Sequence, residues 1–406
     1  MVDEDYKADF PSEIIKEGKV QVLVPKLEAY GVAPSDYAPS KAPVFYNPVM
    51  EFNRDLTVLA FQAYQRMVNR EISICDPFTS QGIRGVRFAA EIQGVKKVLI
   101  SDINERAFKL AKHNVQINGL EKLVAVQHKD ANCVLSCHAS PKKRFDIVDV
   151  DPFGTPAPYL SSAIRAIRNN GLLASTATDL APLCGVHVKA CIRKYGGRPL
   201  RAEYCHELAV RLLAGCTASL AAKHEIGIRV VFSHSSEHYI RVYAQIVYGA
   251  KKADESVKSL GYILHCFNCS HRETTRNPFD KSIEKCPECG SKMDYAGPLW
   301  LGNIFDPNFC ESMIKENKTV AFKNSAKIAK LLALTKDEAS APITYYVLDK
   351  LSGKLGLPSP SIQAFLKALH NSGFQAVPTH FNTRGIRTDA PAQAMRKLLK
   401  EASGVR

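Results

Sequence analysis

An acidic residue, a proline and an aromatic residue end an apolar run at residues 146–156, DIVDVDPFGTP. The exocyclic amine of a nucleobase is a poor nucleophile, because its lone pair is delocalised into the ring. Methyl transfer to that nitrogen therefore needs an acceptor that orients the amine and takes its proton. Asp151, held at a strand end by Pro152, fits this role, and Phe153 offers a face to a base taken out of its stack. We predict a site that methylates an amino nitrogen; a plain turn is the alternative.

Three earlier apolar runs also end in polar residues. Asp76 and the loop TSQGIRG follow ISIC, Asp102 follows KVLIS, and Asp130 follows LVAVQHK. Ligands of open α/β sheets bind outside the carboxyl ends of the strands, so we expect these residues to share one edge with Asp151. The loop after Asp76 would present backbone N–H groups at a helix start to a small anionic or zwitterionic ligand. It lacks the complete G-x-G-x-x-G pattern, and a tight strand-to-helix turn is the alternative.

Asp102 and Asp130 have the positions expected of contacts to a nucleoside. Asp102 lies 26 residues beyond Asp76, near the spacing at which an acidic side chain reaches the two hydroxyls of a ribose. Asp130 and Ala131 could hold the amino group of an adenine. The alternatives are an N-cap role for Asp102 at a helix over 104–117 and a turn role for Asp130.

Four cysteines have the spacing of a structural zinc site. Cys266, Cys269, Cys286 and Cys289 form C-x2-C-x16-C-x2-C, which is typical of two thiolate knuckles that close one tetrahedral Zn²⁺. Because four thiolates leave no position for water, we expect a bracing role and no part in catalysis. Four unligated thiols are the alternative.

Other cysteines and histidines carry weaker signals. Cys184, His187 and Cys191 have helical spacing, which suggests a second metal, but a buried helix face explains it better. Cys205 and His206 are adjacent on an expected helix, so their side chains should point apart and form no catalytic pair.

The charge of the chain favours a polyanionic partner. The 406 residues carry a formal net charge of +14, and neutralisation of phosphates drives binding to nucleic acids. Residues 323–406 hold 13 Lys and Arg against 5 Asp and Glu, so the C-terminal part is the expected contact. Arg198, Arg201 and Arg211, on an expected helix over 197–214, either touch phosphates or form a solvated face.

The compartment is predicted to be the cytoplasm. The N-terminus MVDEDYKADFP is acidic where a signal peptide would be basic and then apolar, and no run of about 18 uncharged apolar residues occurs. Without a signal, the 12 cysteines should be thiols in a reducing compartment.

Short apolar runs alternate with helical stretches after an expected helix near 51–68, which predicts an α/β fold with a mostly parallel, doubly covered sheet. The expected strands lie in ISICDPF, KVLISDI, LVAVQHKD, FDIVDVDPF, GLLASTATD, GIRVVFSHS and YIRVYAQIVY, and the last two could pair antiparallel. Near the C-terminus, PSPSIQAFLKALHNSGFQAVPTHFNTRGIRT reads as a helix followed by a hairpin, as in a winged helix.

Several segments together resemble the tRNA (guanine-26-N2)-dimethyltransferases. They are VFYNPVMEFNRD, DPFTSQGIRGVRFA, DVDPFGTP, TATDLAPLCG, RKYGGRPLRAEYCHELAVR, GYILHCFNC, GPLWLG and THFNTRGIRTDAP, and the likeness spans about residues 12–393. The resemblance implies a Rossmann-like class I enzyme that uses S-adenosyl-L-methionine to place two methyl groups on N2 of guanosine 26 in tRNA, through the monomethyl product.

The resemblance also implies roles for individual residues. The cofactor contacts would be Arg54, Arg84, Asp102, Asp130 and Ala131, and the catalytic group would comprise Asp151 with Phe45 and Phe153 around the target guanine. The two arginines can fork onto the methionine carboxylate. Surface salt bridges for the arginines and simple packing for Phe45 are the alternatives.

We therefore expect a methyltransferase domain over residues 1–255 and a tRNA-binding domain over 256–406 that contains the zinc module at 262–295. The expected cofactors are S-adenosyl-L-methionine and a structural Zn²⁺, and the expected partner is tRNA, with no membrane and no obligate protein partner. The competing hypotheses are an amino methyltransferase for another nucleic acid, such as DNA adenine, and a non-catalytic RNA-binding zinc protein with a degenerate fold.

Overall fold

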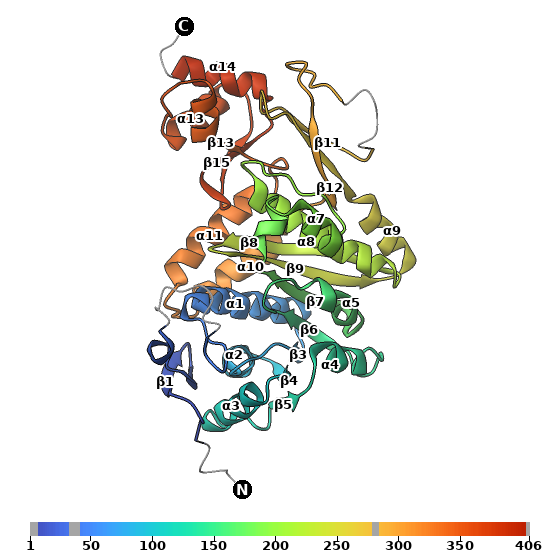
Figure 1. Cartoon of the computed structure of the whole chain (residues 1–406), viewed down its shortest axis with the longest axis vertical. Coiled ribbons are helices and arrows are strands. Elements are labelled where there is room, and N and C mark those ends of the chain that lie inside the picture. Colours follow the sequence, from blue (N-terminus) through green and yellow to red (C-terminus); the bar gives the residue numbers. More distant parts are fainter. Residues whose placement is uncertain (1–6, 32–40, 278–283, 403–406) are drawn as a thin grey trace. The chain divides into compact units, whose positions relative to one another are not determined.

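The central sheet follows from strands that are apolar along nearly their whole length. A computed structural model describes residues 7–31, 41–277 and 284–402 (Figure 1). The sheet has seven strands in the order β5-β4-β3-β6-β7-β9-β8, and the pairs β3/β4, β3/β6, β4/β5 and β6/β7 are parallel. All residues of β6 (Phe145–Val150) are buried, as expected for a strand covered on both faces. The predicted α/β class is confirmed.

The chain divides into two compact units. The first comprises residues 1–175, 245–247 and 311–332, and the second comprises 176–244, 248–310 and 333–406. This division groups residues by their contacts and not by their chemical role, so the predicted functional boundary near residue 255 stays a prediction.

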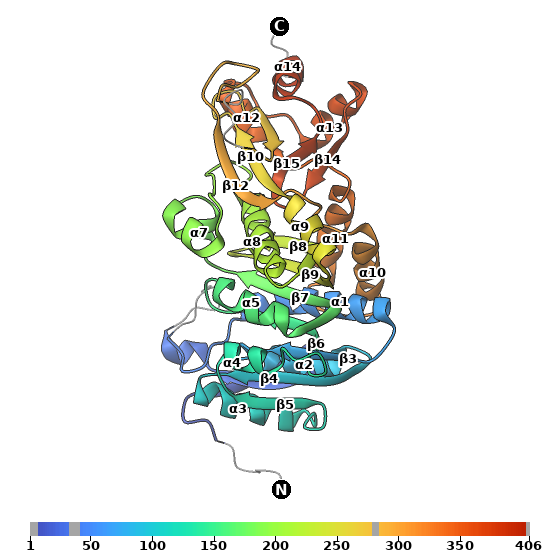
Figure 2. The same ribbon diagram turned by 90° about the vertical axis from the view of Figure 1, so that its right-hand side faces the viewer.

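The first unit contains the predicted strand and helix alternation. Its elements are β1 (Ser12–Glu17), β2 (Val20–Pro25), the 3-10 helices η1 (Leu27–Tyr30) and η2 (Pro48–Met50), α1 (Glu51–Val68), β3 (Ile72–Asp76), α2 (Ile83–Glu91), β4 (Val95–Asp102), α3 (Glu105–Ile117), β5 (Val124–His128), α4 (Ala131–Cys137), β6, α5 (Ala157–Arg165) and most of β7 (Ile167–Ala177). The predicted helix near 51–68 is α1, and Figure 2 shows the same elements turned by 90°.

The second unit contains the C-terminal parts of the fold. Its elements are α6 (Leu180–Leu183), α7 (Val188–Tyr195), α8 (Cys205–Ala222), β8 (Ile226–Ser236), β9 (Tyr239–Tyr248), α9 (Ala250–Lys258), β10 (Leu260–His265), β11 (Arg272–Thr275), β12 (Asp294–Trp300), β13 (Tyr346–Val347), α12 (Leu348–Lys354), α13 (Ile362–Asn371), β14 (Ala376–Thr379), β15 (Asn382–Thr388) and α14 (Ala392–Ala402). Strand β9 and the helices α10 (Pro307–Asn317) and α11 (Ser325–Glu338) are shared between the two units.

Two small antiparallel sheets belong to the second unit, in the orders β11-β10-β12 and β13-β15-β14. The predicted helix and hairpin near the C-terminus correspond to α13, β14 and β15. The core beneath them includes Phe365, Leu369, Ile386 and Met395, each fully buried.

The expected helix over 197–214 begins later than predicted, because α8 starts at Cys205. Arg211 lies inside α8, buried against Glu207, and is not an exposed phosphate contact. Arg198 precedes the helix and pairs with Asp294 at 2.6 Å, while Arg201 is exposed.

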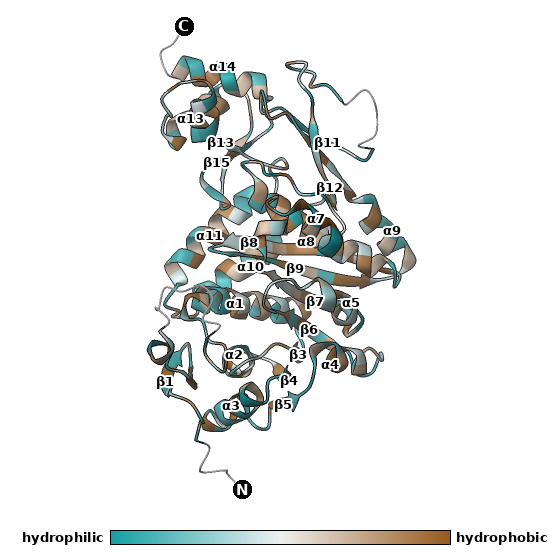
Figure 3. Cartoon of the chain, viewed as in Figure 1, coloured by the Kyte–Doolittle hydropathy of each residue, from teal (hydrophilic) through white to brown (hydrophobic). Residues whose placement is uncertain are grey.

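Colouring by hydropathy shows apolar residues along much of the central strands, while the helices carry both apolar and polar residues (Figure 3). Within the described ranges, no helix combines the length and the apolar character needed to cross a bilayer.

Candidate functional site

The carboxyl end of β6 carries two aspartates on one side of the strand. Side chains alternate along a strand, so Asp149 and Asp151 share a face while the residue between them points the other way. The Asp149 side chain is fully buried, and the Asp151 side chain is 14% exposed. The strand therefore brings one carboxylate into the protein and leaves the next within reach of a ligand.

Arg84 joins these two carboxylates. Its guanidinium forms an ion pair with Asp151, lies 3.3 Å from Oδ2 of Asp149, and donates to Oδ1 of Asn53 at 3.0 Å. Arg84 belongs to the first turn of α2, which follows the TSQGIRG loop, and Asn53 comes from α1. Three segments that are distant in sequence thus fix the orientation of the Asp151 carboxylate.

Asp76 adds a third acidic group at the end of β3. It is completely buried, and its Oδ1 accepts a hydrogen bond from the Phe78 N–H at 3.1 Å. Burial, together with the negative charge of Asp149, raises the pKa of Asp76 to about 7, although Arg84 opposes the shift. Burial and the charge of Asp149 therefore outweigh the effect of Arg84 on this carboxyl group.

The aromatic residues Phe45 and Phe153 touch one another. Their ring centroids are 4.2 Å apart and the rings are inclined by 75°, an edge-to-face contact. The Ser80 hydroxyl donates to the backbone oxygen of Phe45 at 2.6 Å, which ties the segment before α1 to the loop after β3. Phe153 is 63% exposed. The structure brings these two predicted residues together, and it places Phe153 two residues beyond Asp151.

Asp102 lies at the carboxyl end of β4, as predicted. One carboxylate oxygen accepts from the Ser80 N–H at 2.8 Å and the other accepts from the Asn104 N–H at 2.9 Å. The N-cap of α3 is Asn104, whose side chain accepts from the Arg106 N–H. The alternative that Asp102 itself caps this helix is therefore wrong.

Asp130 caps α4, since its Oδ1 accepts from the Cys133 N–H at 3.1 Å, and Ala131 is the buried first residue of that helix. Asp130 thus has a local role as a helix cap and not the turn role that we gave as the alternative. It lies two residues after the end of β5.

Arg54 lies in a different ion-pair group. Its guanidinium binds both carboxylate oxygens of Glu17 at 2.6 Å and donates to the backbone oxygen of Asn47 at 3.1 Å. Arg87 binds the same Glu17 at 2.8 Å and also pairs with Asp55. Arg54 is buried and is not the exposed salt bridge that we gave as the alternative.

The loop after β3 and the end of β4 contain buried polar atoms without a protein partner. Among the described residues these are Oγ1 of Thr79, Oε1 of Gln81 and Oγ of Ser101, and Oδ2 of Asp76 in β3 and Nδ2 of Asn53 in α1 also lack one. Buried polar groups are nearly always hydrogen-bonded in folded proteins. A polar ligand bound beside Arg84 and Asp102 could supply partners to these atoms.

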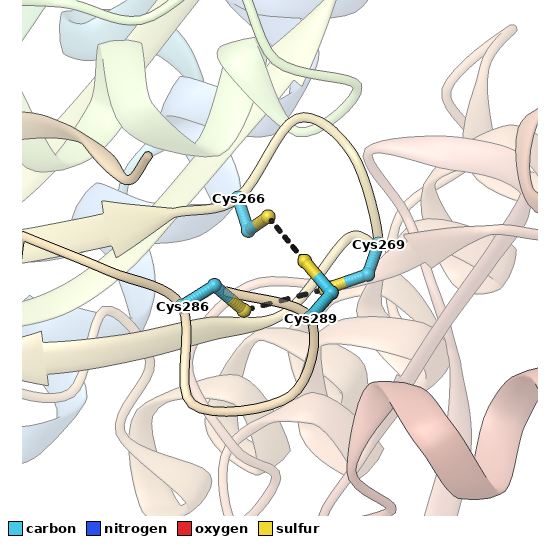
Figure 4. Close-up of side chains that lie close together, drawn as sticks. All are labelled: Cys266, Cys269, Cys286 and Cys289. Carbon is cyan, nitrogen blue, oxygen red and sulfur yellow. Dashed lines mark hydrogen bonds between the residues drawn. The ribbon is translucent and has the colours of Figure 1, made fainter. Parts of the chain in front are cut away.

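The four cysteines of the predicted zinc site, called the four-cysteine knuckle below, converge on one another, as Figure 4 shows. The sulfurs of Cys266 and Cys289 are 3.5 Å apart, those of Cys269 and Cys286 are 3.4 Å apart, and all four lie within 4.8 Å of one another. A tetrahedral Zn²⁺ with Zn–S bonds of about 2.3 Å places its sulfurs about 3.8 Å apart. The residues fit a structural Zn²⁺.

Our reading of the sequence missed three contributors to the site. Asp149, Asn53 and Ser80 all contact predicted site residues. The DVD pattern at 149–151 was the available signal for Asp149, because period-two spacing puts both carboxylates on one face. No comparable pattern marks Asn53 or Ser80.

Comparisons with known proteins cover nearly the whole chain. A family model described as N2,N2-dimethylguanosine tRNA methyltransferase matches residues 18–400. A Methanobrevibacter smithii protein named tRNA (guanine(26)-N(2))-dimethyltransferase is 42% identical over 395 residues, covering 97% of this chain and 99% of that protein. An Aquifex aeolicus protein named tRNA (guanine(26)-N(2)/guanine(27)-N(2))-dimethyltransferase is 36% identical over 397 residues, covering 96% of each.

A solved structure, Trm1 from Pyrococcus horikoshii in complex with S-adenosyl-L-methionine, superposes with a TM-score of 0.83. It is 32% identical and covers 95% of this chain and 99% of that one. The likeness therefore extends over both compact units and not over the central sheet alone.

Proposed function

The chain belongs to the N2,N2-dimethylguanosine tRNA methyltransferase family, and we propose that it methylates the N2 amine of guanosine 26 in tRNA twice. The observation that carries this proposal is the position of Asp151. Its carboxylate lies at the end of a central strand, is oriented by Arg84, and lies two residues from an exposed aromatic ring. An amine that must be oriented and deprotonated requires such an acceptor.

The methyl donor in the proposal is S-adenosyl-L-methionine, which supplies an electrophilic methyl group on a sulfonium. The solved relative holds this molecule, and the unpartnered buried atoms around Arg84 and Asp102 fit a polar cofactor. Asp102 would accept the ribose hydroxyls, and Asp130, with Ala131, would hold the adenine amine. Arg84 would bind the methionine carboxylate. Arg54, which is paired with Glu17, would hold the start of α1 in place beside it.

The Asp151 carboxylate would accept a hydrogen bond from an N–H of the target amine and then receive the proton. The adjacent guanidinium of Arg84 favours the ionised carboxylate. Because the donor is already positively charged, positioning and exclusion of water contribute more than strong acid catalysis does. Asp151 would therefore aim the nitrogen lone pair as well as receive the proton.

Phe45 and Phe153 would hold the guanine after it leaves the tRNA stack. Rings that touch edge to face do not leave room for a base between them, so the two rings must separate when the base enters. Phe153 is the exposed member of the pair. We propose that it moves, while Phe45 stays fixed through Ser80.

Residues 256–406 would bind tRNA, with the four-cysteine knuckle as a brace for this part of the chain. The proposal rests on the excess of Lys and Arg over residues 323–406 and on the fit of the four sulfurs to Zn²⁺. Phosphate contacts of this kind give binding that weakens steeply with salt. We place the protein in the cytoplasm, where a tRNA substrate and unpaired cysteines are both expected.

Nucleoside analysis of tRNA, before and after incubation with the protein and S-adenosyl-L-methionine, tests the proposal. We expect N2-methylguanosine followed by N2,N2-dimethylguanosine at position 26, and no product on tRNA with adenosine at that position. Position 27 should be analysed in the same digest, because one relative is named for both positions. Methylation of adenosine-26 tRNA or of DNA would overturn the substrate, and failure to bind the cofactor would favour the non-catalytic hypothesis.

A further inference from the structure

A second group of metal-ligating side chains lies in the second unit, apart from the four-cysteine knuckle. Sulfur atoms of Cys184 and Cys205 and a ring nitrogen of His206 all lie within 4.8 Å of one another. Cys184 directly follows α6, and the other two residues open α8. The spacing-based suggestion of Cys184 with His187 and Cys191 is therefore replaced by a different set. Cys205 and His206, which we expected to point apart, have their ligand atoms within 4.8 Å of one another, so the two side chains do not diverge fully.

The fold holds the two segments together at this point. Gly185 has a φ of +90°, and a Cβ on it would lie 2.7 Å from the backbone nitrogen of Arg201. Only glycine permits that approach, so the turn after Cys184 rests directly on the chain that leads into α8. The packing of these two backbone segments therefore positions the three side chains.

Cys205 and His206 lie in the first turn of the 18-residue helix α8, where the positive end of the helix dipole stabilises negative charge. All three residues are partly exposed.

The donor set selects the class of metal. Two sulfurs and one imidazole suit Zn²⁺ and similar thiophilic ions, whereas Mg²⁺ and Ca²⁺ prefer oxygen ligands. Three protein ligands leave one position of a tetrahedron for water, unlike the closed set of four cysteines in the knuckle. The chain would then hold two zinc ions of different kinds.

We propose that Cys184, Cys205 and His206 bind a second Zn²⁺, which clamps the turn after α6 to the start of α8. The metal would join the two ends of the segment between Cys184 and Cys205, which contains α7, and would fix this segment to the start of α8. This site is independent of the proposed methyl transfer, and it requires no contact with cofactor or tRNA.

Counting metal after zinc loading tests the proposal. The full-length protein, reconstituted with Zn²⁺ and passed over a desalting column, should contain two zinc ions per chain. Cys205→Ser and Cys184→Ser should each contain one, while Cys137→Ser, which alters an exposed thiol elsewhere, should keep two. One zinc ion in the wild type, or two in Cys205→Ser, would overturn the proposal.

Cobalt substitution separates the two sites by their sulfur count. The proposed site should give about half of the sulfur-to-cobalt charge-transfer intensity of the four-cysteine knuckle, because it has two sulfurs where the knuckle has four. We expect Cys266→Ser with Cys269→Ser to retain only this weaker spectrum, and Cys205→Ser to retain only the stronger one. Loss of both cobalt spectra in Cys205→Ser would mean that this variant is misfolded. His206→Gln then provides the test, because an unchanged full cobalt spectrum would contradict the role of His206 as a ligand.

Discussion

Two buried charge groups in this molecule are built in opposite ways. In the second unit, Glu207 and Glu338 meet Arg211, Arg387 and His380, with Arg387 lying 3.0 Å from Glu207 and 2.7 Å from Glu338. In the first unit, Asp149 and Asp151 at the end of β6 pair with Arg84, and Asp76 at the end of β3 lies in the field of the same charges. In the contacts named here, cations outnumber carboxylates in the first group, and carboxylates outnumber cations in the second.

The difference appears in the pKa values. Burial would raise the pKa of Glu338, but His380 and Arg387 together lower it to about 2. At the other group, burial and Asp149 raise the pKa of Asp76 to about 7 against the opposing effect of Arg84. Carboxylates with raised pKa values are found more often at functional sites than elsewhere in a fold, which supports the site that we propose at the ends of β3 and β6.

Removal of the acceptor should have the largest effect on activity. Asp151→Ala should lower the rate of tRNA methylation by about 10²- to 10⁴-fold, the scale of a positioned acid–base group. Calorimetry with S-adenosyl-L-methionine should show that cofactor binding is retained. A variant that turns over at the wild-type rate would remove Asp151 from the chemistry.

Removal of a cation from the first of these two groups should reduce stability. Arg387→Met leaves two buried carboxylates with fewer partners and should lower the free energy of unfolding by about 3 to 5 kcal/mol, as measured by urea denaturation. Arg384→Met, on the same strand, breaks a more exposed pair with Asp349 and should cost less than about 1 kcal/mol. Equal losses in the two variants would show that burial of the pair does not matter.

The aromatic rings beside the two charge groups should also differ. Phe153 is exposed, and Phe153→Ala should weaken transfer to tRNA by about 5- to 150-fold through the loss of one stacking face, with little change in stability. Phe381 is buried beside Arg387, so Phe381→Ala should lower stability instead. Methylation kinetics and thermal melts on both variants distinguish these outcomes, and a Phe153→Ala variant with wild-type kinetics would exclude the stacking role.

The pH dependence of stability should have opposite signs at the two groups. The pKa of Asp76 is raised from 3.8 to about 7, so the folded state binds more protons than the unfolded state in this window, and stability falls as the pH rises through it. The pKa of Glu338 is lowered from 4.5 to about 2, so its contribution is present above pH 4.5 and is lost as the pH falls toward 2.

Urea denaturation between pH 4 and pH 7, without cofactor, checks the first statement. As the pH rises, the free energy of unfolding of Asp76→Asn should increase relative to that of the wild type. For Glu338→Gln, measured from pH 4.5 downward, the free energy of unfolding should instead approach the wild-type value as the pH falls. Parallel curves for Asp76→Asn and wild type would mean that Asp76 ionises normally.

The sequence predicted what local patterns encode. Alternation of apolar runs located the strands, the residues after those runs located Asp102 and Asp151, and cysteine spacing located the knuckle. Pairing between distant segments was beyond those patterns. The ion pair of Arg54 with Glu17 joins residues 37 apart, and Arg211, which the sequence left open as a phosphate contact, is instead buried beside Glu207.

The sequence also did not predict that Cys184, Cys205 and His206 lie together, again because the contact joins separate segments. The three side chains come from two segments, and the close approach depends on the positive φ of Gly185. The direction of side chains in the first turn of α8 could not be deduced from helical spacing alone. Residue types were sufficient to nominate the cysteines, but not to choose their partners.

Single-turnover methylation of guanosine-26 tRNA by Asp151→Asn, with cofactor and tRNA both saturating, tests the central claim most directly. The amide keeps the shape of the side chain and an acceptor oxygen but cannot take the proton. We predict a rate at least tenfold below that of the wild type, with unchanged cofactor affinity. A wild-type rate under these conditions would contradict the assignment of proton acceptance to this carboxylate.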